Sequence, residues 1–236
     1  MRKYVALAVM LMLSVMGVKA QEVENSVARF SVIPRIGVAI ANVSDNSMYV
    51  QSEQIDQLKS KSQAGFVGGV DVEYRATQYL GISLGAYYAR QGFRYADYEE
   101  VLNDNINKRV GYKNQHANLN YVNVPLMLKA YVTPSLAVMA GVQAGFLCGD
   151  AKFLSESTDL EKDKDGSTIY KDTHKNEDVM PFKKVDVSIP VGVSYEYMNV
   201  ILDARYNIGL KKVYGNEVDK SKNQVLTLTV GYRFTL

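Results

Sequence analysis

The sequence predicts an all-β protein, folded as an eight-stranded antiparallel transmembrane up-and-down β-barrel. The first observation behind this prediction is a two-residue alternation whose apolar face is continuous. Along 185–195 every second side chain is apolar, whereas Asp186, Ser188, Gly192 and Ser194 lie on the other face. Small and charged side chains cannot form a dry core. The apolar face is therefore expected to contact lipid and the polar face to line the interior.

The second observation is that the connections between strands alternate in length. Eight segments are close to the ~9–11 residues that a tilted membrane strand needs. They are 30–41, 64–76, 80–92, 120–132, 136–149, 184–197, 200–210 and 224–236. Three connections are short (77–79, 133–135 and 198–199) and four are long (about 42–63, 93–119, 150–183 and 211–223). Antiparallel strands joined in this way put all long loops at one end, which is typical of outer-membrane barrels with extracellular loops.

The same alternation assigns ten charged side chains to the barrel interior. In strand order they are Arg35 in the first strand, Asp71, Glu73 and Arg75 in the second, Lys129 in the fourth, Asp186 and Glu196 in the sixth, Asp203 and Arg205 in the seventh, and Arg233 in the eighth. Five are acidic and five are basic. An eight-stranded barrel is only wide enough for side chains to fill it, and buried charges must pair. We therefore expect a structural charge network, with a narrow polar path for ions or a small solute as the alternative.

Two features of the strands lead to more detailed expectations. Aromatic side chains fall near strand ends, where two interfacial girdles are expected. The turn-end set is Tyr74, Tyr79, Tyr195, Tyr232 and Phe234, and the loop-end set is Phe66, Tyr88, Phe93, Phe146 and Phe182. Three prolines, Pro34, Pro125 and Pro190, lie inside predicted strands, where each removes a ladder donor. A closed barrel has no free edge for them, so β-bulges are expected there.

The N-terminal residues 1–20 read as an export signal, with cleavage expected after Ala20. Arg2 and Lys3 precede an apolar run that is too short for a spanning helix, and Val18-Lys19-Ala20 has the small residues that a signal peptidase reads. The formal net charge of +2 argues against nucleic acid as a partner. Cys148 is the only cysteine, so no intramolecular disulfide can form.

Catalytic and metal-binding motifs are not evident. His116 and His174 fall in different loops without a second metal-ligating residue at useful spacing, and Cys148 is read as a small packing residue. The stretch from Glu161 to Asp172 partly matches a calcium loop, but interleaved lysines favour a solvated charge run. We expect no cofactor, no metal site and no enzymatic activity.

Three segments carry a family resemblance. The stretch Asn120-Tyr121-Val122-Asn123-Val124-Pro125-Leu126-Met127-Leu128-Lys129-Ala130-Tyr131 resembles the "Y-L-E-I-P-L-L-L-K-Y" signature of the Bacteroidetes outer-membrane β-barrel family that includes PorT. Asn123 stands where that family usually has Glu, and Ala130 adds a residue. The stretch 203–210 and the ending Gly231-Tyr232-Arg233-Phe234 are similar to the same family. The resemblance implies an eight-stranded barrel in the outer membrane of a Bacteroidetes-type cell, and PorT itself is tied to type IX secretion.

The functional expectation is a small non-enzymatic outer-membrane barrel that acts through its surface loops or within an envelope complex. Outer-membrane lipid is the expected partner of the apolar face, and a protein partner or extracellular ligand is expected at the loops. A PorT-like role in secretion is one form of this hypothesis. A narrow channel or small-solute transporter is the alternative, and an enzyme with a loop-level site is a third class supported by little in the sequence.

Overall fold

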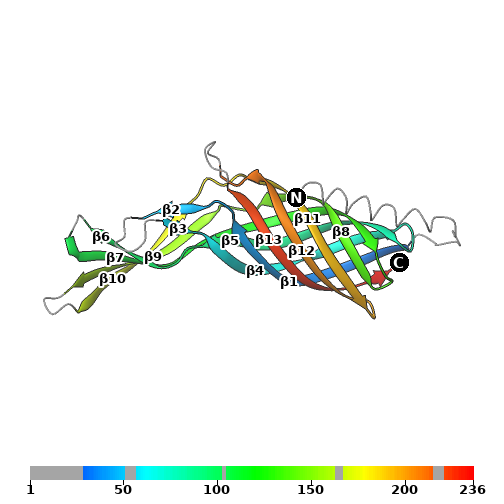
Figure 1. Cartoon of the computed structure of the whole chain (residues 1–236), viewed down its shortest axis with the longest axis horizontal. Helices are drawn as coiled ribbons and strands as arrows, with labels where there is room; N and C mark the ends of the chain where they lie inside the picture. The colour runs from blue at the N-terminus through cyan, green and yellow to red at the C-terminus, as the bar shows by residue number, and fades with distance from the viewer. Residues whose placement is uncertain (1–28, 51–56, 103–104, 163–166, 215–220) are drawn as a thin grey trace.

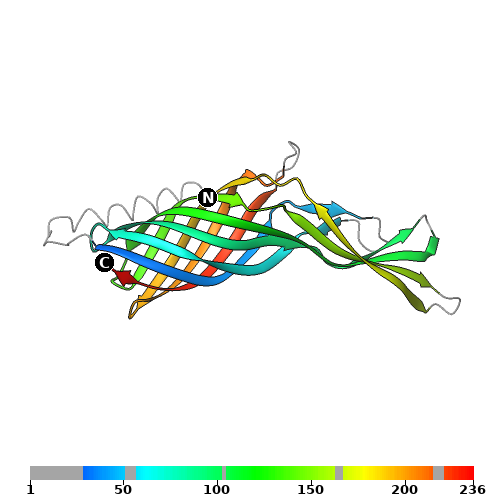
Figure 2. The ribbon, with the colours of Figure 1, turned by 180° about the vertical axis from the view of Figure 1, so that it is seen from behind.

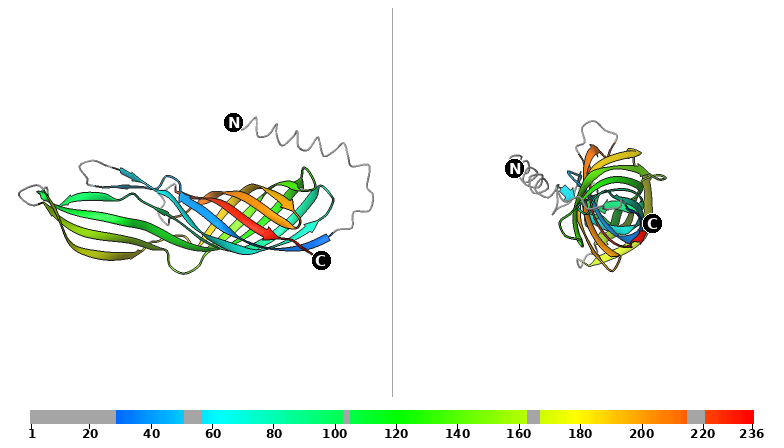
Figure 3. Two further views of the ribbon diagram at one scale, coloured as in Figure 1. Left: turned by 90° about the horizontal axis from the view of Figure 1, so that it is seen from below. Right: turned by 90° about the vertical axis from the view of Figure 1, so that its right-hand side faces the viewer.

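A computed structural model describes residues 29–50, 57–102, 105–162, 167–214 and 221–236. The predicted barrel is present (Figure 1). Eight antiparallel strands form a ring in the order β7-β5-β4-β1-β13-β12-β11-β8, and pairing of β8 with β7 closes it. The strands are β1 (Arg29–Val43), β4 (Lys61–Arg75), β5 (Leu80–Arg94), β7 (Asn105–Tyr131), β8 (Leu136–Leu147), β11 (Val185–Tyr197), β12 (Val200–Lys212) and β13 (Lys222–Tyr232). Seen down the long axis, the ring is closed (Figure 3, right).

The apolar face of each strand points outward, as the alternation predicts. β5 alternates strictly between exposed and buried side chains from Leu80 to Gln91. Its outward residues include Ile82 and Leu84, which are 39% and 55% exposed, whereas the inward residue Ser83 is buried. Exposed apolar residues of this kind recur around the whole ring, so the barrel has a lipid-facing belt. Within the described residues, no helix has the length and apolarity to cross a membrane.

The three short connections lie together at one end of the barrel, opposite the long ones (Figures 1 and 2). Two of them share a motif. The hydroxyl of Thr77 accepts hydrogen bonds from the backbone N–H groups of Tyr79 and Leu80, and Thr133 does the same at 133–136. The third is a two-residue hairpin turn in which Met198 and Asn199 both have positive φ, of 48° and 67°. Positive φ at both central residues matches the right-handed twist of the flanking strands.

At the opposite end, strands continue far beyond the barrel (Figure 1). The N-terminal half of β7 pairs with β6 (Tyr98–Leu102) on one side and with β9 (Lys152–Lys162) on the other, and β10 (Thr168–Val179) pairs with β9. We call this four-stranded unit, in the order β6-β7-β9-β10, the protruding sheet. A separate short hairpin joins β2 (Ser47–Tyr49) to β3 (Gln57–Lys59). Much of what was expected to be solvated loop in 93–119 and 150–183 is therefore regular β-structure.

The expected bulges at the prolines are absent. Pairing keeps one register on both sides of Pro34, Pro125 and Pro190. Instead, the ladder toward one neighbour is interrupted at each proline. At Pro125, β7 lacks pairs with β5 at 124–125, and at Pro190, β11 lacks pairs with β8 at 189–190. At Pro34, β1 lacks pairs at 33–34, where β13 gives way to β14 (Phe234–Thr235). A missing donor thus costs one local interruption, without a shift of register.

The aromatic girdles are only partly as predicted. At the turn end, Tyr79, Tyr195, Tyr232 and Phe234 are 42–52% exposed. At the loop end, Phe66, Tyr88 and Phe146 are 45–56% exposed. The prediction is wrong for Phe93 and Phe182, which are both buried inside the mouth of the barrel. The predicted export signal, residues 1–20, lies outside the described residues.

Candidate functional site

Polar side chains fill the turn-end half of the lumen, and Glu73 is the centre of one group. Its carboxylate accepts hydrogen bonds from the Lys129 ammonium, from the Tyr131 hydroxyl and, at 2.9 Å, from Nη1 of Arg233. Arg233 also donates through Nε to both carboxylate oxygens of Glu196, at 2.9 and 3.0 Å. Glu73 and Lys129 are at most 1% exposed. Charges buried this deeply are stable only when they are paired and hydrogen-bonded, as these are.

A second group lies around Asp71 and Asp203. Asp71 accepts hydrogen bonds from Nε of Arg35 and Nη2 of Arg205, both at 2.9 Å. Asp203 accepts from Nε of Arg205 at 2.8 Å and forms an ion pair with Nη1 of Arg35 at 3.2 Å. Each arginine therefore bridges the same two carboxylates. Strands β1, β4 and β12 contribute these residues, so the group links β4 to β12 across the two strands that separate them in the ring.

The remaining predicted interior residues lie apart from these contacts. The guanidinium of Arg75 stacks over the Tyr131 ring, 3.7 Å from its centroid. Asp186 lies nearer the loop end and accepts hydrogen bonds from its neighbour Val187 N and from Nδ2 of Asn223. The structure thus brings eight of the ten predicted residues into two charge groups. Arg75 joins the first group through the ring of Tyr131, and only Asp186 lies apart from both. The tyrosine partners were missed, although Tyr131 has the same parity as Lys129.

Between the charge groups and the loop end lies a small polar cavity of about 30 Å³. Its lining includes Tyr87, Gln91, Asn123, Arg205, Asn207 and Thr229. Asn207 Oδ1 and Thr229 Oγ1 are buried and have no protein hydrogen-bond partner among the described residues. A water molecule needs roughly 10–15 Å³ of such space, so the cavity suits one or two waters. It is too small for a solute of metabolite size.

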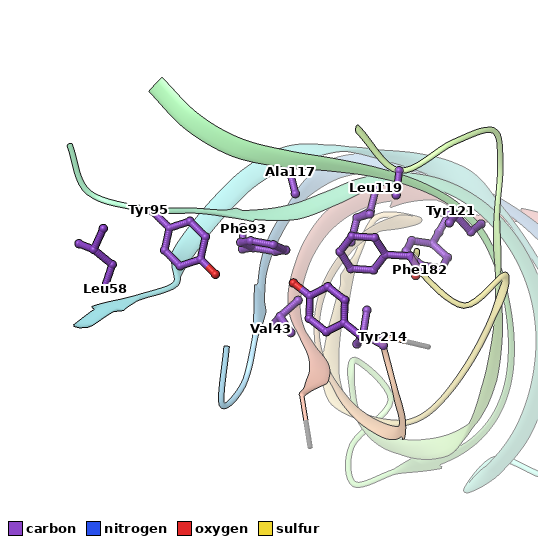
Figure 4. Close-up of a cluster of buried hydrophobic side chains, with 12 residues drawn as sticks. Val43, Leu58, Phe93, Tyr95, Ala117, Leu119, Tyr121, Phe182 and Tyr214 are labelled. Atoms are coloured by element: carbon purple, nitrogen blue, oxygen red, sulfur yellow. The ribbon is translucent and has the colours of Figure 1, made fainter. Parts of the chain in front are cut away.

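Above this cavity, the barrel mouth is filled by apolar side chains (Figure 4). The mouth cluster consists of Val43, Leu58, Phe93, Tyr95, Ala117, Leu119, Tyr121, Leu147, Ala151, Phe182, Val213 and Tyr214, all at most 9% exposed. The Phe93 ring lies 5.5 Å from that of Tyr95 and 6.4 Å from that of Phe182, and Phe182 lies 4.7 Å from Tyr214. These residues come from four barrel strands (β1, β5, β7 and β8), from β3 and from the long connections. They join the connections to the barrel and close its mouth.

The protruding sheet stands beyond this closed mouth. Its outer strand β10 is exposed on both faces, whereas Val110 of β7 and Leu160 of β9 are buried. Tyr98 and Tyr112 lie directly opposite each other on β6 and β7, and their rings stack with centroids 5.0 Å apart. Burial and the carboxylate of Glu100 raise the pKa of Tyr98 to about 12. A groove of about 160 Å³ runs across the sheet at Gly111, with Leu160 and Tyr170 among its lining residues. Tyrosines and charges therefore dominate the most distal surface of the molecule.

Other predicted candidates contribute no site. Nδ1 of His116 lies 2.6 Å from the carbonyl oxygen of Asn114, and His174 is exposed on β10. Cys148 is exposed at the end of β8, so its interpretation as a packing residue was wrong. Four residues of the possible calcium loop, 163–166, lie outside the described residues. In the part of the chain that the structure describes, no three His, Cys, Asp or Glu residues cluster as metal ligands would.

A family model described as "Outer membrane protein beta-barrel domain" matches residues 19–215. No curated protein matches the chain. Among solved structures, the chain is similar to Ail, the attachment invasion locus protein of Yersinia pestis, in complex with the heparin analogue sucrose octasulfate, with 15% identity, a TM-score of 0.42, and coverage of 87% of this chain and 99% of that one. It is also similar to Neisserial surface protein A, with 18% identity, a TM-score of 0.40, and coverage of 87% of this chain and 97% of that one. A third similar structure is the N-terminal barrel domain of Pseudomonas aeruginosa OprF, with 16% identity, a TM-score of 0.31, and coverage of 86% of this chain and 97% of that one.

Proposed function

Because the chain belongs to the outer membrane protein β-barrel domain family, we propose that it is a small non-enzymatic outer-membrane protein that acts outside the cell through its protruding sheet. One observation supports this above all others. The lumen is blocked by paired charges and by the mouth cluster, whereas a four-stranded sheet extends beyond the barrel and its last strand, β10, is exposed along its whole length. The barrel then serves as an anchor, and the sheet is the part that meets partners.

A narrow channel is the second candidate, because charged side chains do line the lumen. Conduction would require ions to pass the Glu73 and Asp71 groups and then the mouth cluster, where twelve side chains are at most 9% exposed. Breaking buried ion pairs is costly, and an apolar constriction excludes ions by dewetting. Purified protein in planar bilayers is therefore expected to show no conductance steps. Regular steps from the unmodified protein would favour the channel.

The proposal is tested by removing the protruding sheet and keeping the barrel. The backbone N–H of Tyr95 donates to the carbonyl of Gln115, so residues 96–114 can be replaced by an Asn-Gly turn. Lys152 and Val179 are directly opposite each other, so 153–178 can be replaced in the same way. Both changes leave the eight-stranded ring and most of the mouth cluster in place.

Three strains are compared: the unmodified strain, the gene deletion and the strain that carries the trimmed variant. The readouts are attachment to protein-coated and glycan-coated surfaces, cell clumping, and the secreted and surface-shaved proteomes. We expect the trimmed variant to reproduce the deletion in the surface assays. Full complementation by the trimmed variant would refute the proposal.

The PorT-like hypothesis makes its own prediction in the same strains. A role in secretion predicts that deletion causes cargo proteins to accumulate in the periplasm. If the trimmed variant restores secretion, the barrel or its periplasmic turns carry that role. If it does not, the protruding sheet contacts the secretion complex.

A further inference from the structure

The outermost strand of the protruding sheet offers a long free edge. β10 pairs with β9 on one side and is the last strand of the sheet order, so its other edge has no strand partner among the described residues. All twelve of its side chains are exposed. From Thr173 to Val179 its pairing with β9 is regular, and the one register shift lies before Thr173. Seven residues of unpaired, regular edge are therefore available for another strand.

This regular stretch has a charge pattern that complements itself. Its central residues read His174-Lys175-Asn176-Glu177-Asp178, with basic residues before Asn176 and acidic residues after it. When two such strands pair antiparallel about Asn176, Lys175 of each copy lies opposite Glu177 of the other, and His174 lies opposite Asp178. Glu177 also forms an ion pair with Lys152 of its own chain, but its side chain is half exposed and can accept a second cation. Directly opposed residues of opposite charge stabilise a strand pair, and like charges destabilise it. Parallel pairing in register would instead oppose Lys175 to Lys175 and Glu177 to Glu177.

We propose that β10 binds β10 of a second copy of this chain, antiparallel and centred on Asn176, so that the protein is a homophilic adhesin. This inference rests on the proposed function and names the partner. The observations that carry it are the free regular edge, its full exposure and its self-complementary charges. A β-strand edge supplies main-chain hydrogen bonds to any extended partner, and the charges select the partner and the register.

The direction of β10 places the two copies in opposing membranes. β10 runs from the tip of the protruding sheet back toward the barrel (Figure 1). Two copies in one membrane are related by a two-fold axis along the membrane normal, which leaves their β10 strands running the same way. Antiparallel pairing needs an axis across the strand, and this relates copies that face each other. The contact is therefore between two cells, or between two vesicles.

The structure also sets the distance at which the membranes meet. The exposed Phe146 marks the lipid boundary, and Val122 of β7 lies directly opposite it. Asn118 is four residues further out along β7, and it lies level with Lys152 of β9 and Val179 of β10. Asn176 is three residues further, so the centre of the contact lies about 23 Å beyond the lipid boundary at ~3.3 Å per residue. The two membranes are then separated by about 45 Å. β10 continues eight residues outward from Asn176 to Thr168, about 49 Å from its own lipid boundary, so the tip of each sheet reaches the surface of the opposing membrane.

Charge reversal tests this arrangement with the full chain in phospholipid vesicles that contain no other protein. Unmodified protein is expected to cluster vesicles, with the gap above visible by cryo-electron microscopy. Lys175→Glu vesicles alone and Glu177→Lys vesicles alone are each expected to cluster at least about tenfold less, because two attractive pairs become repulsive. A mixture of the two variants should cluster again, since every Glu at 175 and 177 then meets a Lys.

Lys171→Glu is the matched control, because it makes the same charge change on the same strand outside the regular stretch. It also breaks one ion pair with β9, that of Lys171 with Glu161, just as Glu177→Lys breaks that of Glu177 with Lys152. It is expected to leave clustering unchanged. Unheated gel mobility checks that every variant is folded. The inference is overturned if unmodified vesicles stay dispersed, or if the mixture clusters no better than each variant alone. If this happens while the trimmed strain still loses surface attachment, the proposed function stands and its partner is a different molecule.

Discussion

Replacement of Glu73 by glutamine is the most direct test of the charge network. Glu73 is the only carboxylate within ion-pair distance of Lys129 in the described structure, and Lys129 is 1% exposed. Glutamine keeps the shape of the side chain and removes its charge. Lys129 is then a buried ammonium without a counter-charge, while Arg233 keeps its two hydrogen bonds to Glu196.

The expected loss follows from these contacts. Removing one partner of a buried ion pair costs about 3–5 kcal/mol, because the remaining charge stays buried and uncompensated. At ~1.4 kcal/mol for each factor of ten, the unfolding equilibrium constant rises roughly one hundred to four thousand fold. Urea unfolding of the protein in lipid vesicles, followed by unheated gel mobility, measures this free energy.

Two further variants make the test decisive. Glu196→Gln also removes a carboxylate from Arg233, but its side chain is 19% exposed and Arg233 keeps Glu73, so a loss below about 1.5 kcal/mol is expected. Glu73→Gln combined with Lys129→Met removes the stranded charge and should recover most of the lost stability. The reasoning is refuted if the two glutamine variants are equally stable, or if the double variant is no more stable than Glu73→Gln.

Three other predictions follow from the mouth and the protruding sheet. Phe93→Ala removes a fully buried ring from the mouth cluster and should lower the free energy of unfolding in urea by about 3–5 kcal/mol. Bilayer recordings of this variant should still show no conductance, because the charge groups remain; conductance steps would mean that the mouth cluster alone closes the lumen. Cys148 is exposed at the loop end, so a membrane-impermeant maleimide should label it on intact cells, and labelling only after lysis would reverse the assigned orientation. Because the pKa of Tyr98 is raised to about 12, its neutral form stabilises the β6–β7 pairing fully below pH 10, and this contribution should be lost between pH 10 and 12, which hydrogen exchange across that range measures. Glu100→Gln should lower the ultraviolet titration midpoint of Tyr98, and an unchanged midpoint would contradict the role of the Glu100 carboxylate.

The barrel could be predicted from the sequence because its strands have two different faces. Each strand buries one face in the lumen and presents the other to lipid, and this leaves a two-residue alternation. Parity therefore placed Asp71 and Glu73 inside. The same rule applied to Phe93, which shares the parity of the inward Gln91, would have turned it into the lumen; its position near a strand end suggested the girdle instead.

The protruding sheet could not be predicted in the same way. β10 is exposed on both faces, so its sequence carries no alternation between apolar and polar residues. Its strand conformation is imposed by pairing with β9, and β9 is in turn held by β7. The prolines show a similar limit: the sequence reveals that a donor is missing, but only the pairing on both sides shows which ladder loses it.

The length of β7 has a mechanical consequence. This strand has 27 residues and runs from the protruding sheet through the barrel to the turn end, with one bulge at Asn114, where φ is 53°. Its length along the chain is about 90 Å at ~3.3 Å per residue. A pull on its outer part is transmitted along one covalent strand into the membrane. The hydrogen bonds that hold β7 to β5 and β8 lie across that direction, so force shears many of them together and does not open them one by one. An anchor built in this way resists tension along its own axis far better than it resists peeling from the side.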